Sequence, residues 1–308
     1  MKYLKIILLQ GLLLLMPVFS IAQQLPQFSQ YMYNTISINP AYAGSREIMV
    51  INLLNRNQWV GVNGAPVTQT LSVHSSVPGT KLGLGLSVIN DKLGYDNTTY
   101  IYSDVSYTLN LSDKYWLAFG LKVGASKFSL DDDIYNDPAY NNDPYLDYLY
   151  NGWDPNFGVG IYFRSDKFYM GLSSPKLVNY KKRSDLDYIP IDRVSYYLNG
   201  GYLWEYNSSN LKFKPTFLLK YTNGAPLSVD VTGNVLLYDK LWLGLSYRLK
   251  DSFGAMANFN IAKGLNIGYA YDYITSDLAP FTSGSHEIIL QYEFNFPRPR
   301  CKCTDLHN

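Results

Sequence analysis

From about residue 48 to residue 296, apolar and polar side chains alternate in steps of two along most of the chain, and helical periodicity is almost absent. A period of two is typical of a β-strand with one face in apolar surroundings. The last such segment shows the two faces, with His286, Ile288, Leu290, Tyr292, Phe294 and Phe296 on one and Glu287, Ile289, Gln291, Glu293 and Asn295 on the other. The pattern therefore predicts an all-β protein.

The alternation divides into roughly fourteen segments that are bounded by turn residues. They fall at 47–56, 67–76, 82–90, 98–111, 115–127, 155–165, 167–173, 191–205, 211–222, 226–237, 241–250, 253–262, 264–275 and 285–296. Many have the length of about ten residues that a tilted strand needs to cross a membrane. An even number of strands returns the chain to its starting side. We therefore predict a transmembrane antiparallel β-barrel over residues 47–296.

The connections between the predicted strands alternate between short and long. Short links lie at 77–81, 112–114, 165–166, 206–210, 238–240 and 262–263. The other set contains longer links at 57–66, 91–97, 129–154, 174–190 and 276–284, and two short ones near 223–224 and 251–252. Outer-membrane barrels have short turns in the periplasm and long loops outside. We therefore predict a cell outer membrane protein with both termini in the periplasm.

The ends of the chain lack the strand pattern. Residues 1–22 have a basic start, an apolar core and small residues before position 23, which predicts a cleaved signal peptide. Residues 23–46 are interpreted either as a plug in the lumen or as a periplasmic segment without a fixed position. The residues of the candidate plug are Phe28, Tyr31, Tyr33, Asn39, Pro40 and Tyr42. Residues 297–308 are expected to form a periplasmic tail.

Composition and charge narrow the function classes. Aromatic residues make up 16% of the chain, with 29 Tyr against 5 Trp, and tyrosine suits both strands and membrane interfaces. The formal net charge of +1 indicates no nucleic-acid partner. The two cysteines, Cys301 and Cys303, lie in the last eight residues. The sequence therefore predicts a barrel without a disulfide framework.

Ionisable residues within the strands are expected inside the barrel. A charge on the lipid face near the middle of the bilayer costs about 2–4 kcal/mol, and the alternation places most strand charges on the opposite face. Mixed signs there favour a plugged or narrow lumen over a selective pore. The predicted lumen network consists of Asp104, Lys122, Lys220, Asp230, Arg248, Asp272, Glu287 and Glu293.

Four runs of sequence, distributed in order over nearly the whole chain, carry a resemblance to a known family. They are QFSQYMYNTISINPAYAGS (27–45), NRNQWVGVNGAPVTQTLSVHSSVP (55–78), GLGLSVINDKLG (83–94) and YDYITSDLAPFTSGSHEIILQYEF (271–294). Together they resemble the PorP/SprF family of Bacteroidetes outer-membrane proteins. The resemblance implies a component of the type IX secretion system, which exports adhesins, gliding-motility proteins and enzymes. It implies no catalytic residue.

Candidate metal and phosphate sites are weak. Cys301, Cys303 and His307 could form half of a zinc site, but they lack the usual spacing. Gly83 and Gly85 precede no helix and are expected to let the strand bend or let something pack closely against it. We therefore predict no metal, no cofactor and no enzymatic activity.

The acidic loop at 131–147 offers many oxygen ligands but lacks EF-hand spacing. One interpretation is a solvated surface loop. A loop rich in Tyr and Asn also suits protein recognition. The residues predicted to bind a partner are Asp131, Asp132, Asp133, Tyr135, Tyr140, Tyr145, Tyr148, Tyr180 and Arg183.

The predicted function is that of an outer-membrane accessory of type IX secretion. It would aid the export or surface attachment of a secreted substrate, such as an adhesin or a gliding or cell-surface protein, and would meet periplasmic secretion components. One alternative is a transport barrel for hydrophobic or small solutes. Another is an outer-membrane lipase or protease, although the sequence identifies no Ser-His-Asp or paired-carboxylate constellation.

Overall fold

The computed structural model describes residues 26–46, 48–131, 133–134, 138, 153–178, 193–206 and 211–294. The predicted signal peptide and the predicted C-terminal tail lie outside the described residues. Within the part of the chain that is described, no helix is long and apolar enough to cross a membrane.

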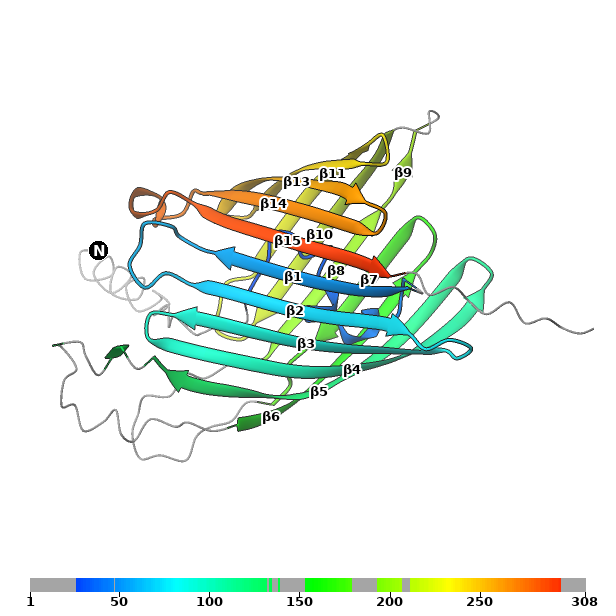
Figure 1. Cartoon of the computed structure of the whole chain (residues 1–308), viewed down its shortest axis with the longest axis horizontal. Coiled ribbons are helices and arrows are strands. Elements are labelled where there is room, and N and C mark those ends of the chain that lie inside the picture. The colour runs from blue at the N-terminus through cyan, green and yellow to red at the C-terminus, as the bar shows by residue number, and fades with distance from the viewer. Residues whose placement is uncertain are drawn as a thin grey trace, which may run out of the picture.

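The strands close into a single barrel (Figure 1). They are β1 (Met49–Asn57), β2 (Val67–Ser76), β3 (Leu82–Leu93), β4 (Asp96–Ser112), β5 (Tyr115–Leu130), β6 (Trp153–Arg164), β7 (Phe168–Ser174), β8 (Ser195–Tyr202), β9 (Trp204–Glu205), β10 (Leu211–Thr222), β11 (Ser228–Leu237), β12 (Leu241–Arg248), β13 (Ser252–Ala262), β14 (Leu265–Ile274) and β15 (Ser285–Phe294). Neighbours pair antiparallel, and pairing of β1 with β15 and of β10 with both β8 and β11 closes the ring. The two-residue β9 pairs with β10 beyond the end of β8. The predicted barrel of about fourteen strands is therefore confirmed.

The two faces of the strands differ in polarity. In β3, the outward side chains of Leu84 and Leu86 are 49% and 56% exposed, whereas the inward Ser87 is buried. Large apolar side chains recur on the outward faces of other strands, including Leu53, Leu71, Val105, Leu121, Val159, Leu172 and Leu245. Removing apolar surface from water is favourable by about 25 cal/mol per Å². A lipid bilayer is therefore the environment that stabilises this outer surface.

The barrel has one end with short turns and one end with longer links. In Figure 1 the short turns lie on the right, where β15 ends, and the longer links lie on the left. One link of the left end includes a short 3-10 helix, η5 (Ala279–Phe281). The barrel therefore has the asymmetry that the sequence pattern predicts.

The prediction of a longer link at residues 91–97 is wrong. Strand β3 continues to Leu93 and β4 begins at Asp96, which leaves a turn of two residues in which Gly94 has a φ of +60°. The polar side chains nearby pair across the strands, with the Asn90 side-chain amide donating to the side-chain oxygen of Asn97 at 2.8 Å. Polar residues therefore extend these strands instead of ending them.

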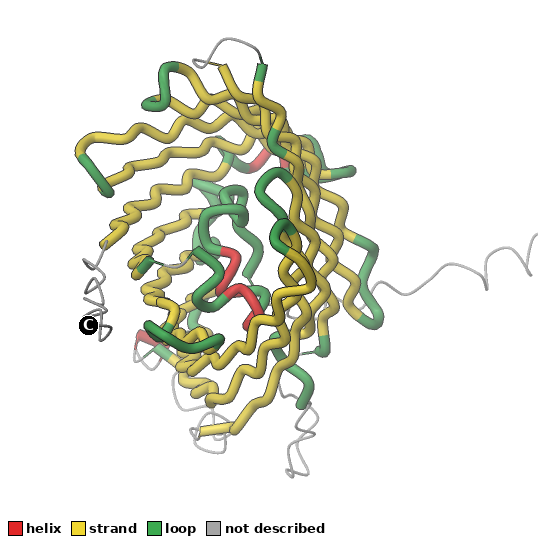
Figure 2. The backbone as a smooth tube through the Cα atoms, turned by 90° about the vertical axis from the view of Figure 1, so that its right-hand side faces the viewer, coloured by secondary structure: helices red, strands yellow, loops and turns green. Residues whose placement is uncertain are grey.

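Residues 26–45 lie inside the ring of strands, where Figure 2 shows them enclosed by the barrel wall. We call them the inner segment. It includes two 3-10 helices, η1 (Thr35–Ser37) and η2 (Pro40–Tyr42). Asn39 caps η2, because its side-chain oxygen accepts a hydrogen bond from the Ala41 amide at 2.9 Å. The inner segment is buried along most of its length, so its contacts with the wall form the core of the protein.

Candidate functional site in the barrel lumen

A buried ionic cluster lies where the barrel closes. The Arg56 guanidinium on β1 contacts the Asp272 carboxylate on β14 at 2.8 Å and the Glu287 carboxylate on β15 at 3.0 Å. All three side chains are at most 4% exposed. Buried charges persist when they are paired and hydrogen-bonded. We call Arg56, Asp272 and Glu287 the deep ionic cluster.

The deep ionic cluster holds the first part of the inner segment. The backbone amides of Ser29 and Gln30 donate to the two carboxylate oxygens of Glu287 at 2.9 and 2.8 Å. The Ser29 hydroxyl donates to Asp272 and accepts a hydrogen bond from Arg56 at 2.9 Å. Hydrogen bonds that involve an ionised group are about twice as strong as neutral ones. The cluster therefore binds the segment as well as joining three strands.

A second ion pair also contacts the inner segment. Arg248 on β12 contacts Asp230 on β11 at 2.7 Å, and the Gln27 side-chain amide donates to Asp230 at 2.6 Å. The contact lies close to where the described part of the inner segment begins. The carboxylate thus receives hydrogen bonds both from the wall and from the segment.

A third ion pair contacts the middle of the inner segment. Lys122 on β5 contacts Asp104 on β4 at 2.8 Å, and its ammonium donates to the Ile36 carbonyl oxygen at 3.3 Å. Both charged side chains are fully buried. Ion pairs therefore hold the segment at three places on the wall.

Glycines of the wall hold the later part of the inner segment by shape. We call Gly83, Gly120, Gly160 and Gly171 the glycine bed. A Cβ atom at Gly120 would overlap the Ala41 amide nitrogen, and one at Gly83 would overlap the Ala43 carbonyl oxygen. At Gly160 it would meet the Asn39 side chain. Of the two expectations for Gly83, the structure shows close packing against the strand.

Hydrogen bonds to the wall accompany this close fit. The Asn39 side-chain amide donates to the Ile161 carbonyl oxygen at 3.0 Å. The Ser106 hydroxyl donates to the Ala43 carbonyl oxygen at 2.6 Å, and the Ser173 hydroxyl donates to the Ile38 carbonyl oxygen at 2.8 Å. Backbone groups of the segment that are shielded from water are thereby paired.

The aromatic residues that were candidates for a plug contact the wall at separate places. Phe28 packs against Leu54 and Ile289. The Tyr31 hydroxyl lies 2.9 Å from that of Thr216. The rings of Tyr33 and Tyr42 extend the same packing, Tyr42 edge-on to His74 and Tyr162 at 5.2 and 5.4 Å between centroids. The segment is therefore packed along its whole described length.

The predicted lumen residues lie in local clusters on the inner face. Asp104 with Lys122, and Asp230 with Arg248, form pairs, while Asp272 and Glu287 share Arg56. Glu293 contacts Arg46 at 2.7 Å. The Lys220 ammonium lies 5.8 Å from the centroid of the Tyr197 ring. Sequence reasoning missed Arg46 and Arg56, although Arg56 shares the inward parity of Asn52 and Leu54.

Of the residues predicted to bind a partner, the structure describes Asp131 and Asp133. The Lys92 ammonium donates to the Asp131 carboxylate, and the Asp133 amide donates to the same carboxylate at 3.2 Å. These hydrogen bonds lower the pKa of the Asp131 carboxyl. The other residues of this set lie outside the described residues; they are Asp132, Tyr135, Tyr140, Tyr145, Tyr148, Tyr180 and Arg183.

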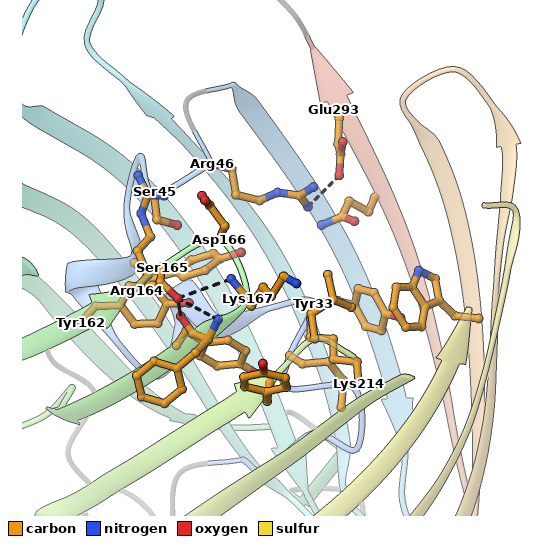
Figure 3. A pocket seen from close by; sticks show the side chains of 18 of the residues that line it. Tyr33, Ser45, Arg46, Tyr162, Arg164, Ser165, Asp166, Lys167, Lys214 and Glu293 are labelled. Carbon is orange, nitrogen blue, oxygen red and sulfur yellow. Dashed lines mark hydrogen bonds and ion pairs between the residues drawn. The ribbon is translucent and has the colours of Figure 1, made fainter. Parts of the chain in front are cut away.

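An open recess of about 430 Å³ lies inside the barrel at its short-turn end (Figure 3). We call it the mouth recess. The inner segment contributes Tyr33 and Tyr42, Arg46 follows it directly, and the wall contributes further aromatic and charged side chains, among them Tyr169 and Lys214. Burial raises the pKa of both Tyr33 and Tyr42, so their hydroxyls stay protonated. The recess therefore combines aromatic walls with neutral and cationic donors.

The described residues contain no group of three or more metal-ligating side chains. Cys301, Cys303 and His307 lie outside them. The ion pairs Arg56–Asp272, Arg56–Glu287, Lys122–Asp104 and Arg248–Asp230 join strands of the wall and bind the inner segment. The arrangement can hold a segment in place and exclude water from much of the barrel.

Comparison with solved structures returns outer-membrane barrels. The outer membrane protein Omp33 of Acinetobacter baumannii is 9% identical, with 81% of this chain and 98% of that chain covered and a TM-score of 0.47. A FadL homologue of Pseudomonas aeruginosa is 10% identical, with 85% and 94% covered and a TM-score of 0.48. The KdgM porin is 14% identical, with 80% and 99% covered and a TM-score of 0.40. No curated protein matches the chain.

A family model matches residues 20–292, and its description is "Type IX secretion system membrane protein PorP/SprF". The match includes the inner segment and nearly all of the barrel. The family and the fold point to a membrane component of secretion rather than to an enzyme. The chain belongs to the PorP/SprF family of type IX secretion system membrane proteins.

Proposed function

We propose that this outer-membrane barrel is an accessory that aids the export or surface attachment of a secreted type IX substrate, such as an adhesin or a gliding protein. The family match over residues 20–292 is the observation that carries the proposal. Its substrate would be a folded or folding polypeptide, and its action would be recognition rather than catalysis.

The proposed orientation places the short-turn end in the periplasm. Single-chain outer-membrane barrels have short periplasmic turns and longer external loops. This barrel likewise has short turns at one end and longer links at the other. The chain leaves β15 at the short-turn end, beside the start of β1. The loops that follow β5 and β7 would then face outward, where they would contact the exported substrate.

The filled lumen supports recognition over conduction. The inner segment is held by ion pairs at three places and by the glycine bed at a fourth. A transporter for small solutes would require a hydrated path through this packing. Single-channel recording in planar bilayers distinguishes the two functions, because the accessory function predicts no stable conductance from the intact protein.

The proposal is tested by deletion and complementation in the native bacterium. Deletion is expected to remove at least one type IX substrate from the cell surface, measured by surface labelling and mass spectrometry. Complementation with a variant that carries Tyr140→Ser, Tyr145→Ser and Tyr148→Ser is expected to restore less display than the wild type. Tyr238→Ser, at an exposed tyrosine of the short-turn end, is the matched control. Unchanged display of every substrate after deletion would contradict the proposal.

A further inference from the structure

The mouth recess carries an excess of cationic side chains. Four of its lining residues are basic and two are acidic: Arg46, Arg164, Lys167 and Lys214 against Asp166 and Glu293. Arg46 and Glu293 contact each other at 2.7 Å, so they neutralise one another. The Arg164 guanidinium lies over the Trp116 ring at 4.5 Å, which leaves Lys167 and Lys214 beside the single carboxylate of Asp166. The recess is therefore suited to an anion.

Two of the cations lack an anionic partner within the part of the chain that is described. No described carboxylate lies within the 4.0 Å contact distance of the Lys167 or Lys214 ammonium. The Lys214 ammonium lies 5.6 Å from the centroid of the Tyr169 ring. Figure 3 shows that Lys167 and Lys214 reach the recess from different parts of the wall. Their positive charges are available to a ligand in the recess.

A buried hydroxyl of the recess also lacks a partner. The Tyr169 hydroxyl is shielded from solvent and makes no hydrogen bond within the described structure. Most buried polar groups in proteins are hydrogen-bonded, so such a group calls for an explanation. A carboxylate that entered the recess would accept from the Lys214 ammonium and, after a movement of the neighbouring Tyr169 ring, from its hydroxyl. Hydrogen bonds of this kind are charge-assisted and therefore strong.

We propose that the mouth recess binds a glutamate or aspartate side chain of an acidic peptide segment that belongs to a periplasmic partner protein. This inference rests on the proposed function, which places the short-turn end in the periplasm. The carboxylate lies against Lys214 and Lys167. The neighbouring peptide residues pack on the rings of Tyr33 and Trp242, which also line the recess. The partner thereby contacts the inner segment itself.

The location and size of the recess favour a peptide over a lipid. The recess lies inside the ring of strands, whereas lipid headgroups surround the outside of a barrel. Its volume of about 430 Å³ is within the usual range for ligand pockets. The aromatic walls provide rigid surfaces for side chains that flank the carboxylate. A small free anion would use the cations alone.

The test uses the purified full-length barrel in detergent and two fluorescent octapeptides. One alternates glutamate with serine, and the other has glutamine in place of glutamate. Fluorescence anisotropy is expected to show binding of the glutamate peptide and at least tenfold weaker binding of the glutamine peptide. Lys214→Gln and Lys167→Gln are each expected to weaken binding of the glutamate peptide by about tenfold or more, as the loss of a hydrogen bond to a charged group predicts.

Matched controls separate the ligand site from folding and from general charge. Lys81→Gln removes an exposed lysine at the same end of the barrel, outside the recess, and is expected to leave binding unchanged. Heat-modifiable migration in gels verifies that each variant is folded. Equal binding of both peptides, or wild-type affinity in Lys214→Gln, would overturn the proposal. Competition by free glutamate as effective as by the peptide would also overturn it, because it would indicate a small-anion site.

Failure here can be told apart from failure of the proposed function. The peptide assay uses the isolated barrel and does not depend on which substrate is exported. If the glutamate peptide does not bind while deletion removes a surface substrate, the accessory function stands and the recess proposal fails. If the peptide binds with the expected dependence on Lys214 while display is unchanged by deletion, the recess is a peptide site and the accessory function fails.

Discussion

The two halves of the inner segment are held by different physical means. The first half, around Ser29 and Gln30, is bound by ionised side chains of the deep ionic cluster. The second half, around Asn39 and Ala41, lies on the glycine bed and makes neutral hydrogen bonds. Ionised side chains therefore bind the first half, and glycines without side chains leave space in the wall for the second half.

This difference predicts how each half fails. Removing one member of a buried ion cluster leaves the others without compensation, which is strongly destabilising. Adding atoms to a close-packed contact forces displacement, which typically costs less. The first half should therefore be sensitive to loss of charge and the second half to gain of volume.

The largest effect is expected from Arg56→Ala. It leaves the carboxylates of Asp272 and Glu287 buried without their cation, which predicts a loss of about 3–5 kcal/mol in the free energy of unfolding. Guanidinium unfolding in detergent, followed by tryptophan fluorescence, measures it. Arg46→Ala is the matched control, because the Arg46–Glu293 pair is partly exposed and predicts at most about 1 kcal/mol. Equal losses in the two variants would show that burial does not decide the effect.

A smaller loss is expected from Gly120→Val. The new side chain would overlap the Ala41 backbone and displace the second half of the segment, which predicts a loss of about 1–3 kcal/mol. Hydrogen exchange is expected to become faster at the Ala41 and Ala43 amides than at Ser29. Gly233→Val is the matched control, because a Cβ there meets Phe213 at an ordinary distance of 3.5 Å. Equal exchange at both halves would contradict the proposed division.

The sequence predicts the wall of the barrel better than its contents. Alternation in steps of two places Asp104, Lys122, Asp230 and Arg248 on the inner face. Asp104 pairs with Lys122, and Asp230 with Arg248, because each pair lies on two strands that are neighbours in the sequence. Arg56 has the same parity, but it contacts residues 216 and 231 positions away. That contact depends on the register between the first and last strands, which alternation does not fix.

The glycine bed is harder still to predict from the sequence. Gly83 and Gly120 each lie in a predicted strand, where a glycine is equally compatible with a bend or with close packing. The structure identifies close packing because it places the Ala43 and Ala41 backbone against them. A single sequence contains no signal for which segment occupies the space. The recess likewise brings together residues from widely separated strands, and the sequence alone did not indicate it.

Asn39→Ala tests the hydrogen bonds of the second half without a change toward larger volume. The variant loses the cap of η2 and removes the side-chain hydrogen bond to the Ile161 carbonyl oxygen, which predicts a loss of about 1–2 kcal/mol. Guanidinium unfolding measures the loss, with Asn55→Ala on the outward face as the matched control. If Asn39→Ala loses less free energy of unfolding than Asn55→Ala, the hydrogen bonds of Asn39 do not stabilise the second half and packing alone does.

The smallest effect is expected from an ion pair that lies outside both halves. Lys92 and Asp131 form a contact near the end of β5, and the Lys92 ammonium holds the pKa of the Asp131 carboxyl below its ordinary value. The sign follows from this depression. The contact stabilises the folded state above the ordinary aspartate pKa, and that contribution is lost as the pH falls through the lowered pKa. Carbon NMR of labelled aspartate should give a titration midpoint that Lys92→Gln shifts upward. An unchanged midpoint would contradict the pairing. Because the pair is partly exposed, we expect no loss of global stability as the pH falls through the lowered pKa. A global loss at that pH would show that this pair stabilises the whole barrel.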